Sequence, residues 1–358
     1  MTLPPVNQDK DAITLDPNFS TTRLVTQEKP VITNDPSSKV QSVLFLPPNP
    51  ERRGEGGLRT KGYFKKSYDE ESDLSGNLLV PLVTIITVVF NSEKYLEQTI
   101  QSVINQTYDN VEYIVIDGGS TDGTVDIIRK YEEKIDYWVS EPDNGIYDAM
   151  NKGISLSTGN IIGIINSDDF YVDDAIVIVV QKYKEYLNPD CKKQLIIGGS
   201  MFGIDDNNHI RCKIYKTKKY FDANIDKNMP VNHPTTFIDS NLYTTIGVFN
   251  TKYKIAADYD LIYRSYCSQV AEFVLIDDFI ASMRSGGLST KFKSLWVKAK
   301  ERYLIRKNNI SLHKNLIFSL EVFLKESIKQ LLIPMLNGSL LSVYYRYREN
   351  KNQPIKNS

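Results

Sequence analysis

The chain has 358 residues, which is enough for one large domain or two small ones. Its formal net charge of −1 excludes nucleic-acid binding that depends on overall positive charge. Its three cysteines, Cys191, Cys212 and Cys267, are too widely spaced for a zinc motif and too few for a disulfide framework, so we expect a reducing compartment.

The opening stretch MTLPPVNQDKDAITLD has no basic region followed by an apolar one, so no signal peptide is expected. No window reaches the roughly 18 uncharged apolar residues that a membrane-spanning helix needs. We therefore expect a cytoplasmic protein, or one bound to the cytosolic face of a membrane. Residues 1–78 hold eight of the fifteen prolines without apolar periodicity, which predicts a disordered lead segment.

Strands and helices are expected to alternate from residue 79 onward. The buried-strand runs are VTIITVV (83–89), VEYIVID (111–117), IDYWVS (135–140) and NIIGIIN (160–166). The helical runs are EKYLEQTIQSVINQ (93–106), TVDIIRKYEE (124–133), IYDAMNKGI and DDAIVIVVQKYKEYL (173–187). This order predicts an α/β fold with a mostly parallel sheet flanked by helices. Ligands bind such sheets outside the carboxyl ends of the strands, where polar clusters fall at Asn91, 117–122, 141–144 and 168–169.

The pattern is mixed after residue 190. QLIIGG, RCKIYK and EFVLIDDFIASM indicate strands, VNHPTTFI a loop entering a strand, and ADYDLIYRSYCS a helix. Residues 291–358 carry fourteen Lys and Arg against four Glu, and apolar residues recur there at helical spacing from Leu316 to Met335. This predicts a basic amphipathic helical tail behind a catalytic domain of residues 79–290.

Two acidic motifs have competing interpretations. DGGSTDGT (117–124) lacks the spacing of a dinucleotide-binding or calcium loop, so it is either a carboxylate that receives a ligand at a strand end or a plain tight turn. SEPDNGIYDAMNKG (140–153) places acids at a helix start, where helix capping explains them equally well.

The adjacent acids Asp168 and Asp169 follow a strand that is expected to be buried. Burying an uncompensated pair of charges there costs stability, so we expect a divalent cation to neutralise them. The alternative is a surface turn in which water solvates both acids. His233 stands in a loop, where a structural role is the alternative. Asp258 and Asp260 stand near a helix start, where the helix dipole alone accounts for an acid.

Taken together, these motifs resemble glycosyltransferase family 2, the inverting nucleotide-sugar-dependent enzymes of GT-A fold, and within it the capsule and exopolysaccharide branch. The resemblance covers residues 80–290 and rests on VTIITVVFN, SVINQTYDNVEYIVIDGGSTDGT, SEPDNGIYDAMNKGI and TGNIIGIINSDD in that order. It implies that Thr87, Val89 and Asn91 lie under the nucleotide and that Asp117 contacts its base, usually uracil.

The resemblance also implies roles for the later motifs. Asp143 and Asn144 lie near the donor, and Asp169 binds manganese or magnesium with Asp168 beside it, although the first position of this DxD-like triplet is Ser167. Asp258 falls at the position of the catalytic base, preceded by Ala257 where the family often has Glu. His233 resembles a histidine on the acceptor or diphosphate side, and RSGGLS, beginning at Arg284, a loop that closes on the diphosphate.

The resemblance implies a reaction that moves a sugar, with inversion, from a nucleotide-sugar donor to a glycan or lipid-linked acceptor in cell-surface polysaccharide synthesis. The family's usual donor is a UDP-sugar, which we expect here. The metal neutralises the leaving diphosphate, and Asp258 takes the proton of the acceptor hydroxyl. A non-catalytic nucleotide-sugar-binding subunit is the alternative. A sugar nucleotidyltransferase would need a Gly-rich basic loop after the first strand, which FNSEKYLEQ does not provide. The basic tail predicts contact with an anionic membrane surface.

Overall fold

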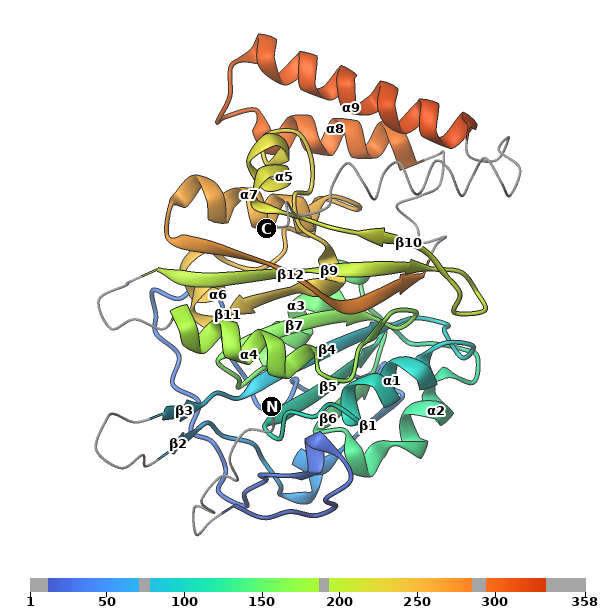
Figure 1. The fold of residues 1–358 in the computed structure, drawn as a ribbon. Helices are drawn as coiled ribbons and strands as arrows, with labels where there is room; N and C mark the ends of the chain where they lie inside the picture. The colour runs from blue at the N-terminus through green and yellow to red at the C-terminus, as the bar shows by residue number, and fades with distance from the viewer. Residues whose placement is uncertain (1–11, 71–77, 187–192, 285–293, 333–358) are drawn as a thin grey trace, which may run out of the picture.

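A computed structural model describes residues 12–70, 78–186, 193–284 and 294–332. Its core is one ten-stranded sheet in the order β1-β6-β5-β4-β7-β11-β9-β12-β8, with β10 beside β9 (Figure 1). The strands are β1 (Gly54–Gly56), β4 (Val83–Val89), β5 (Val111–Asp117), β6 (Tyr137–Ser140), β7 (Ile161–Asn166), β8 (Phe170–Tyr171), β9 (Gln194–Ile204), β10 (Ile210–Ile214), β11 (Thr236–Asp239) and β12 (Ala271–Arg284). A separate pair is formed by β2 (Tyr68–Glu70) and β3 (Leu78–Val80).

The central strands β6, β5, β4 and β7 are parallel, which confirms the expected α/β class with a parallel central sheet. Every residue of β4 and β5 is buried, as their β-branched runs predict. Beyond β7 the sheet is mixed, because β11 runs antiparallel to both β7 and β9, whereas β12 runs parallel to β9.

Helices cover both faces of the sheet. The helices of the described residues are α1 (Leu96–Ile104), α2 (Thr124–Lys130), α3 (Ile146–Leu156), α4 (Ala175–Tyr186), α5 (Lys218–Asn224), α6 (Ser240–Ile246), α7 (Ala257–Ser268), α8 (Leu295–Arg306) and α9 (Leu312–Leu332). One hydrophobic core joins the sheet to α1 and α4, and a second joins the opposite face to α3, α6 and α7.

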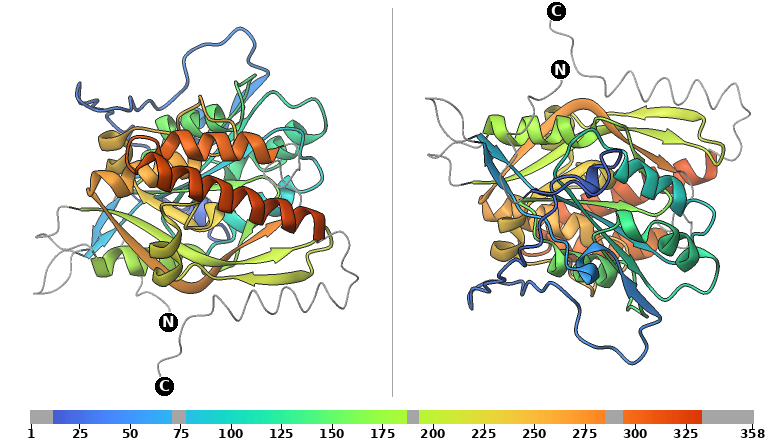
Figure 2. Two further views of the ribbon diagram at one scale, coloured as in Figure 1. Left: turned by 90° about the horizontal axis from the view of Figure 1, so that it is seen from above. Right: turned by 90° about the horizontal axis from the view of Figure 1, so that it is seen from below.

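The expectation of a disordered lead segment is wrong for residues 12–70. This stretch, called the lead segment below, crosses the β6 edge of the sheet, where its β1 pairs with β6, and extends from α1 on one side to α3 and α6 on the other (Figure 2, right). Polar bonds to distant backbone hold it. The Ser20 hydroxyl donates to the carbonyl of Val103 (3.0 Å), and the Thr21 hydroxyl donates to that of Lys134 (2.7 Å). Bonds of this kind leave no apolar periodicity in the sequence, and the proline-rich composition therefore suggested disorder.

At the other edge, α8 and α9 pack on each other above α7 and form the C-terminal hairpin (Figure 1). Arg306 is fully buried at its centre. It donates to Asn315 Oδ1 (3.0 Å) of α9 and to the Lys227 carbonyl (2.6 Å) of the domain. Within the described ranges no helix is long and apolar enough to cross a membrane.

Candidate functional site

The polar motifs meet where the parallel strands end. Val89, the last residue of β4, lies opposite Asp117, the last residue of β5, and Asp117 lies opposite Ser140, the last residue of β6. The carboxyl ends of adjacent parallel strands share one edge of a sheet, so the loops that follow them form a single surface.

Asp117 organises the loop that follows β5. Its buried carboxylate accepts bonds from the amides of Gly119 (3.2 Å) and Ser120 (3.0 Å) and from the hydroxyls of Ser120 and Ser140. The turn depends on Gly119, whose φ of 84° favours glycine. A ligand N–H that reaches this carboxylate therefore competes with two hydroxyl donors, which can rotate away.

The three residues expected under the nucleotide differ in position. The Thr87 hydroxyl lies 3.0 Å from the Tyr113 hydroxyl inside the core, and Val89 is buried, so neither side chain faces a ligand surface. Asn91 is exposed, with a φ of 49°, and its Oδ1 accepts from the Thr121 amide (2.8 Å). Asn91 thus joins the end of β4 to the Asp117 loop.

Asp143 and Asn144 order the start of α3. Asp143 Oδ1 accepts from the Gly145 amide (2.7 Å), and the Asn144 amide donates to Asp148 Oδ2 (3.0 Å). The other oxygen of Asp143 stands over the Asp117 loop, since a Cβ built on Gly118 would lie 2.4 Å from it. The N-cap of α3 is Gly145, and no side chain caps the helix, so neither Asp143 nor Asn144 is the N-cap that the capping interpretation expected. Asp143 instead lies between the start of α3 and the Asp117 loop.

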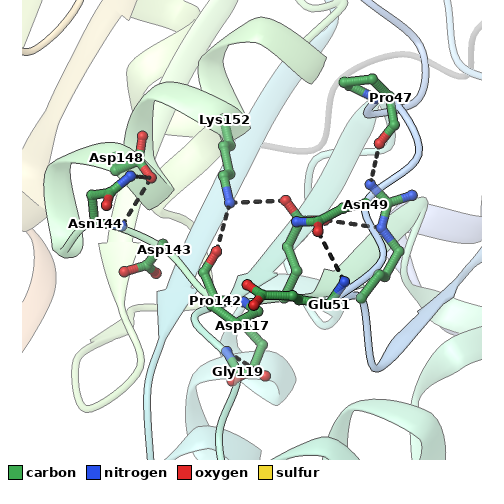
Figure 3. A network of polar contacts seen from close by, with 12 residues as sticks. Pro47, Asn49, Glu51, Asp117, Gly119, Pro142, Asp143, Asn144, Asp148 and Lys152 are labelled. Carbon is green, nitrogen blue, oxygen red and sulfur yellow. Dashed lines mark hydrogen bonds and ion pairs between the residues drawn. The ribbon is translucent and has the colours of Figure 1, made fainter.

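The buried Glu141 links this site to the lead segment, and the sequence did not indicate this link. Figure 3 shows the surrounding polar network, in which Lys152 also donates to the Pro142 carbonyl. Glu141 accepts from Arg52 Nε (2.9 Å) and from Lys152 Nζ (2.9 Å). Burial alone would raise the pKa of Glu141, but the bonds from Lys152 and Arg52 bring it below its ordinary value. The neighbouring Arg53 donates from Nη1 to the carbonyls of Gly119 (2.7 Å) and Ser120 (3.0 Å).

Asp168 and Asp169 have different surroundings after β7. Asp169 is 2% exposed, and its Oδ1 accepts from the Arg284 amide (2.9 Å). Burial and the adjacent Asp168 raise the pKa of Asp169 to about 8. Asp168 is partly exposed, and burial raises its pKa as well. Of the two, Asp168 is the carboxylate that a ligand can reach.

Arg284 is a packing residue as much as a ligand candidate. Its guanidinium donates to the Asp205 carbonyl (2.7 Å) and to Asn208 Oδ1 (2.8 Å), and it lies 4.2 Å from the centre of the Tyr95 ring. It therefore fixes the end of β12 beside the acidic pair. The rest of the RSGGLS loop lies outside the described residues.

The acidic pair fits a divalent cation. Among the ion pairs of the described ranges, none includes Asp168 or Asp169, and burial together with the adjacent Asp168 makes the ionised form of Asp169 unfavourable without a cation. The same ranges hold no cluster of three or more His, Cys, Asp or Glu that could enclose a metal. One or two carboxylates suffice for magnesium or manganese when substrate phosphates complete the coordination.

Asp258 and His233 line one small cavity, with a volume of about 20 Å³, which is room for roughly one water molecule. Asp258 is partly exposed near the start of α7, and burial raises its pKa despite the nearby His233. Burial lowers the pKa of His233, whose Nδ1 is buried and has no hydrogen-bond partner among the residues that the structure describes. An accessible carboxylate with a raised pKa beside a neutral imidazole is suited to accept a proton.

Two aromatic residues connect Asp258 with the α3 motif, and sequence reasoning singled out neither. Tyr147 stacks on Phe249 with ring centres 5.5 Å apart, and burial and the charge of Asp258 raise the pKa of Tyr147. Asn151 accepts from the Phe249 amide (3.0 Å), which secures the contact. Asp260 points elsewhere and pairs with Arg264 (2.8 Å), as a structural residue does.

Comparison with known proteins places this arrangement in context. The family model described as glycosyl transferase family 2 matches residues 84–238. An uncharacterized glycosyltransferase of Mycobacterium tuberculosis is 34% identical over 186 residues, which is 52% of this chain and 69% of that protein. A chondroitin synthase of Escherichia coli is 26% identical over 252 residues, which is 70% of this chain but 35% of the synthase.

Among solved structures, residues 1–349 of TarS from S. aureus superpose with a TM-score of 0.50 at 18% identity, over 69% of this chain and 72% of that one. At this identity the likeness concerns the fold. Arg53, Asp258 and the C-terminal hairpin all lie outside residues 84–238.

Proposed function

The chain belongs to glycosyltransferase family 2, and from that premise we propose that it transfers a sugar, with inversion, from a nucleoside-diphosphate donor to a glycan or lipid-linked acceptor in polysaccharide synthesis. The main support is that Asp117, Asp143 and the acidic pair lie on one surface at the strand ends. Asp258 lines a cavity nearby and interacts with Tyr147, which belongs to the same α3 motif as Asp143. The relation to a chondroitin synthase supports a polysaccharide product.

The donor is proposed to bind across the ends of β5 and β7. The Asp117 carboxylate accepts from an N–H of the base, which favours uracil, and Asn91 and Asp143 border the same loop. Asp168, rather than the Asp169 expected from the sequence, is proposed to hold the divalent cation. Asp169 is fixed by the Arg284 amide and thereby orients the neighbouring Asp168. When bound, the cation neutralises charge that develops on the leaving diphosphate.

Asp258 is proposed to take the proton of the attacking acceptor hydroxyl. A carboxylate with a raised pKa is a stronger base than a solvated one, and the neutral His233 beside it does not compete for the proton at neutral pH. A single base on one side of the sugar and a cation at the leaving group suffice for one in-line displacement.

Turnover of Asp258→Asn tests this proposal. With UDP-, GDP- and dTDP-sugars screened first for nucleoside diphosphate release, we expect turnover to fall by roughly 100-fold or more while donor affinity is kept. Asp260→Asn is the matched control, because it breaks the Arg264 pair and lowers the melting temperature without removing the base. Normal turnover in Asp258→Asn would remove this carboxylate as the base. No turnover by the unmodified protein with any donor would favour a binding subunit.

The cation assignment has its own test. Asp168→Asn is expected to abolish the manganese-dependent part of nucleoside diphosphate binding in calorimetry, because cation and diphosphate bind as one unit. Asp169→Asn is expected to weaken it as well and also to lower stability, since it disturbs the bond from the Arg284 amide. Manganese-dependent binding that survives in both variants would contradict the assignment.

The C-terminal hairpin is proposed to rest on an anionic membrane surface, where a lipid-linked acceptor would be found. Large apolar side chains are exposed on α9 at a spacing close to four, which places them on one face: Leu312, Leu316, Ile317, Leu320, Leu324 and Ile328. Exposed Lys314 and Lys325 accompany them, and the neighbouring Trp296 of α8 is 73% exposed. An apolar stripe with cations beside it complements anionic lipid.

Flotation with vesicles tests this contact. The full chain is expected to float with phosphatidylglycerol vesicles and less with phosphatidylcholine alone. The triple variant Leu316→Ser, Leu320→Ser, Leu324→Ser is expected to lose flotation on both. Equal flotation of the two proteins would contradict the membrane contact. A dimer that forms without lipid and dissociates in the triple variant would instead assign the face to a second copy of the chain.

A further inference from the structure

Glu301 is a buried acid on the inner face of α8. Its side chain is 6% exposed, yet it has no basic partner within 4.0 Å in the described ranges. Three backbone amides satisfy it instead. Lys254 donates to Oε1 (2.7 Å), and Ile255 and Ala256 donate to Oε2 (3.0 and 2.9 Å). Bonds to a charged acceptor are roughly twice as strong as neutral ones, which offsets the burial of the charge.

The three amides belong to the segment that begins α7. The first N–H groups of any helix lack intrahelical partners, and a side chain at the N-cap normally accepts from them. Here the N-cap is Ala256, which has no acceptor, and α7 shows no side-chain cap. Glu301, from a different helix, accepts from the amide of this N-cap residue and from the amides of the two residues before it, so it fixes the chain where it enters α7. Its negative charge also suits the positive end of the α7 dipole.

Asp258 is the second residue of α7, two residues after the last amide that Glu301 holds. Its carboxylate accepts from the Tyr259 amide (2.7 Å), so its direction depends on how the first turn of α7 is set. Between Glu301 and Asp258 there is only the short backbone path 256–258, and the next α8 residue, Arg302, lies close enough to lower the pKa of Asp258.

We propose that Glu301 is a positioning residue for catalysis: by fixing the amides of residues 254–256, it sets the first turn of α7 and with it the Asp258 carboxylate. This rests on the proposed role of Asp258 as the base. It makes α8 part of the catalytic apparatus, although α8 lies beyond the matched family region and its sequence indicates only a basic amphipathic tail.

Glu301→Gln in the full-length protein is the test. The amide keeps the size of the side chain but has one acceptor oxygen in place of two, so at least one of the three bonds is lost. We expect kcat to fall by roughly 10- to 100-fold, the range that a misplaced reacting group can cost, while donor Kd stays within about twofold. Hydrogen exchange should accelerate at the amides of 254–256 but not at β4 or β5.

Two further variants complete the design. Glu301→Asp keeps the charge but is shorter by one methylene, so it should show the same pattern to a smaller degree. Glu321→Gln is the matched control in the same hairpin. Its partly exposed carboxylate pairs with Lys227 and Lys325 and touches none of the three amides, so kcat should not change.

Each outcome decides between readings of Glu301. A loss of donor affinity together with kcat would assign Glu301 to general support of the fold and overturn the proposal. Unchanged kcat in Glu301→Gln alongside an inactive Asp258→Asn would overturn the positioning role while leaving the base in place. Normal turnover in Asp258→Asn would remove the base itself, whatever the Glu301 variants do.

Discussion

The lead segment and the C-terminal hairpin flank the same sheet but attach to it by opposite means. The lead segment lies along the β6 edge and the hairpin above β12 and β10 (Figure 1). Each is fixed by a buried arginine. Arg59 of the lead segment pairs with the carboxylate of Glu112 in β5, and both side chains are 1% exposed. Arg306 of the hairpin is equally buried, but its bonds go to uncharged oxygens.

The comparison shows that a buried cation can be stabilised either by an ion pair or by neutral oxygen acceptors alone. The two arrangements are expected to lose different amounts of stability when the cation is removed. Removing one half of a buried ion pair leaves an uncompensated charge, which is strongly destabilising. Removing a cation that is surrounded by carbonyl and amide oxygens leaves only neutral acceptors, whose loss of partners costs less.

The largest effect is therefore expected for Arg59→Met. Glu112, whose other bonds come from the hydroxyls of Thr84 and Thr158 and the amide of Thr158, would be left buried without its ion-pair partner. We expect the free energy of unfolding to fall by about 3–5 kcal/mol, measured by urea denaturation. The double variant Arg59→Met, Glu112→Gln should recover most of that loss. No recovery would mean that packing, not charge, dominates at this position.

A smaller loss is expected for Arg306→Met. Burial lowers the pKa of Arg306, which shows that the charged form is not fully compensated there. Its removal leaves the Asp226 and Lys227 carbonyls and Asn315 Oδ1 without this donor, for which we expect about 1–3 kcal/mol by the same measurement. A loss as large as that of Arg59→Met would contradict the distinction drawn between the two segments.

The sequence predicted the two segments unequally for a physical reason. The hairpin has apolar residues at helical spacing, so its helices could be expected. However, the three amides held by Glu301 come from another part of the chain, and no local pattern indicates them. The lead segment has neither helical nor strand periodicity. Its contacts combine scattered buried apolar side chains, such as Leu24, with hydroxyl and guanidinium bonds to distant backbone, such as Ser20 to Val103. Neither kind of contact forms a local pattern in its proline-rich sequence.

The central domain was more predictable, because its buried strands are continuous β-branched runs. The positions of Asp117, Asp168 and Asp258 at strand ends or helix starts follow from those runs. The direction of each side chain does not. Thr87 faces the core hydroxyl of Tyr113, and Asp169 rather than Asp168 turns inward, because neighbouring segments decide which side of a loop is buried.

The hairpin is also expected to influence the pH dependence of turnover. The base must be ionised, so kcat should fall tenfold for each pH unit below the pKa of Asp258, which burial raises above 3.8. The titratable groups that act on it are Arg302 and Lys298 of α8, which oppose the rise, and His233, which opposes it only when protonated and is neutral at neutral pH because its own pKa is lowered. Arg302→Met should therefore move the acid limb of the kcat profile to higher pH.

Lys300→Met serves as the control, because Lys300 is exposed on the same helix and is not among the groups that act on Asp258. An acid limb that moves equally in both variants would show a general charge effect. A limb that moves to lower pH in Arg302→Met would contradict the assignment of the titrating group to Asp258.

The smallest effect is expected on nucleoside diphosphate affinity, where the lead segment contacts the Asp117 loop. Arg53 holds the carbonyls of Gly119 and Ser120, and its own amide donates to the Ser140 carbonyl (2.7 Å), so it braces the loop that Asp117 shapes. Arg53→Met should weaken nucleoside diphosphate binding by about 3- to 10-fold in calorimetry, matching roughly one net hydrogen bond. Stability should change little, because Arg53 is exposed.

Arg23→Met is the control. Arg23 pairs with Asp109 (3.1 Å) and donates to the Gln106 carbonyl (3.0 Å). Its loss affects the lead segment but not the Asp117 loop, so affinity should not change. Equal losses of affinity in both variants would mean that the lead segment supports the site only through its folded structure. Of the two segments, the C-terminal hairpin alone would then contribute individual residues to the site.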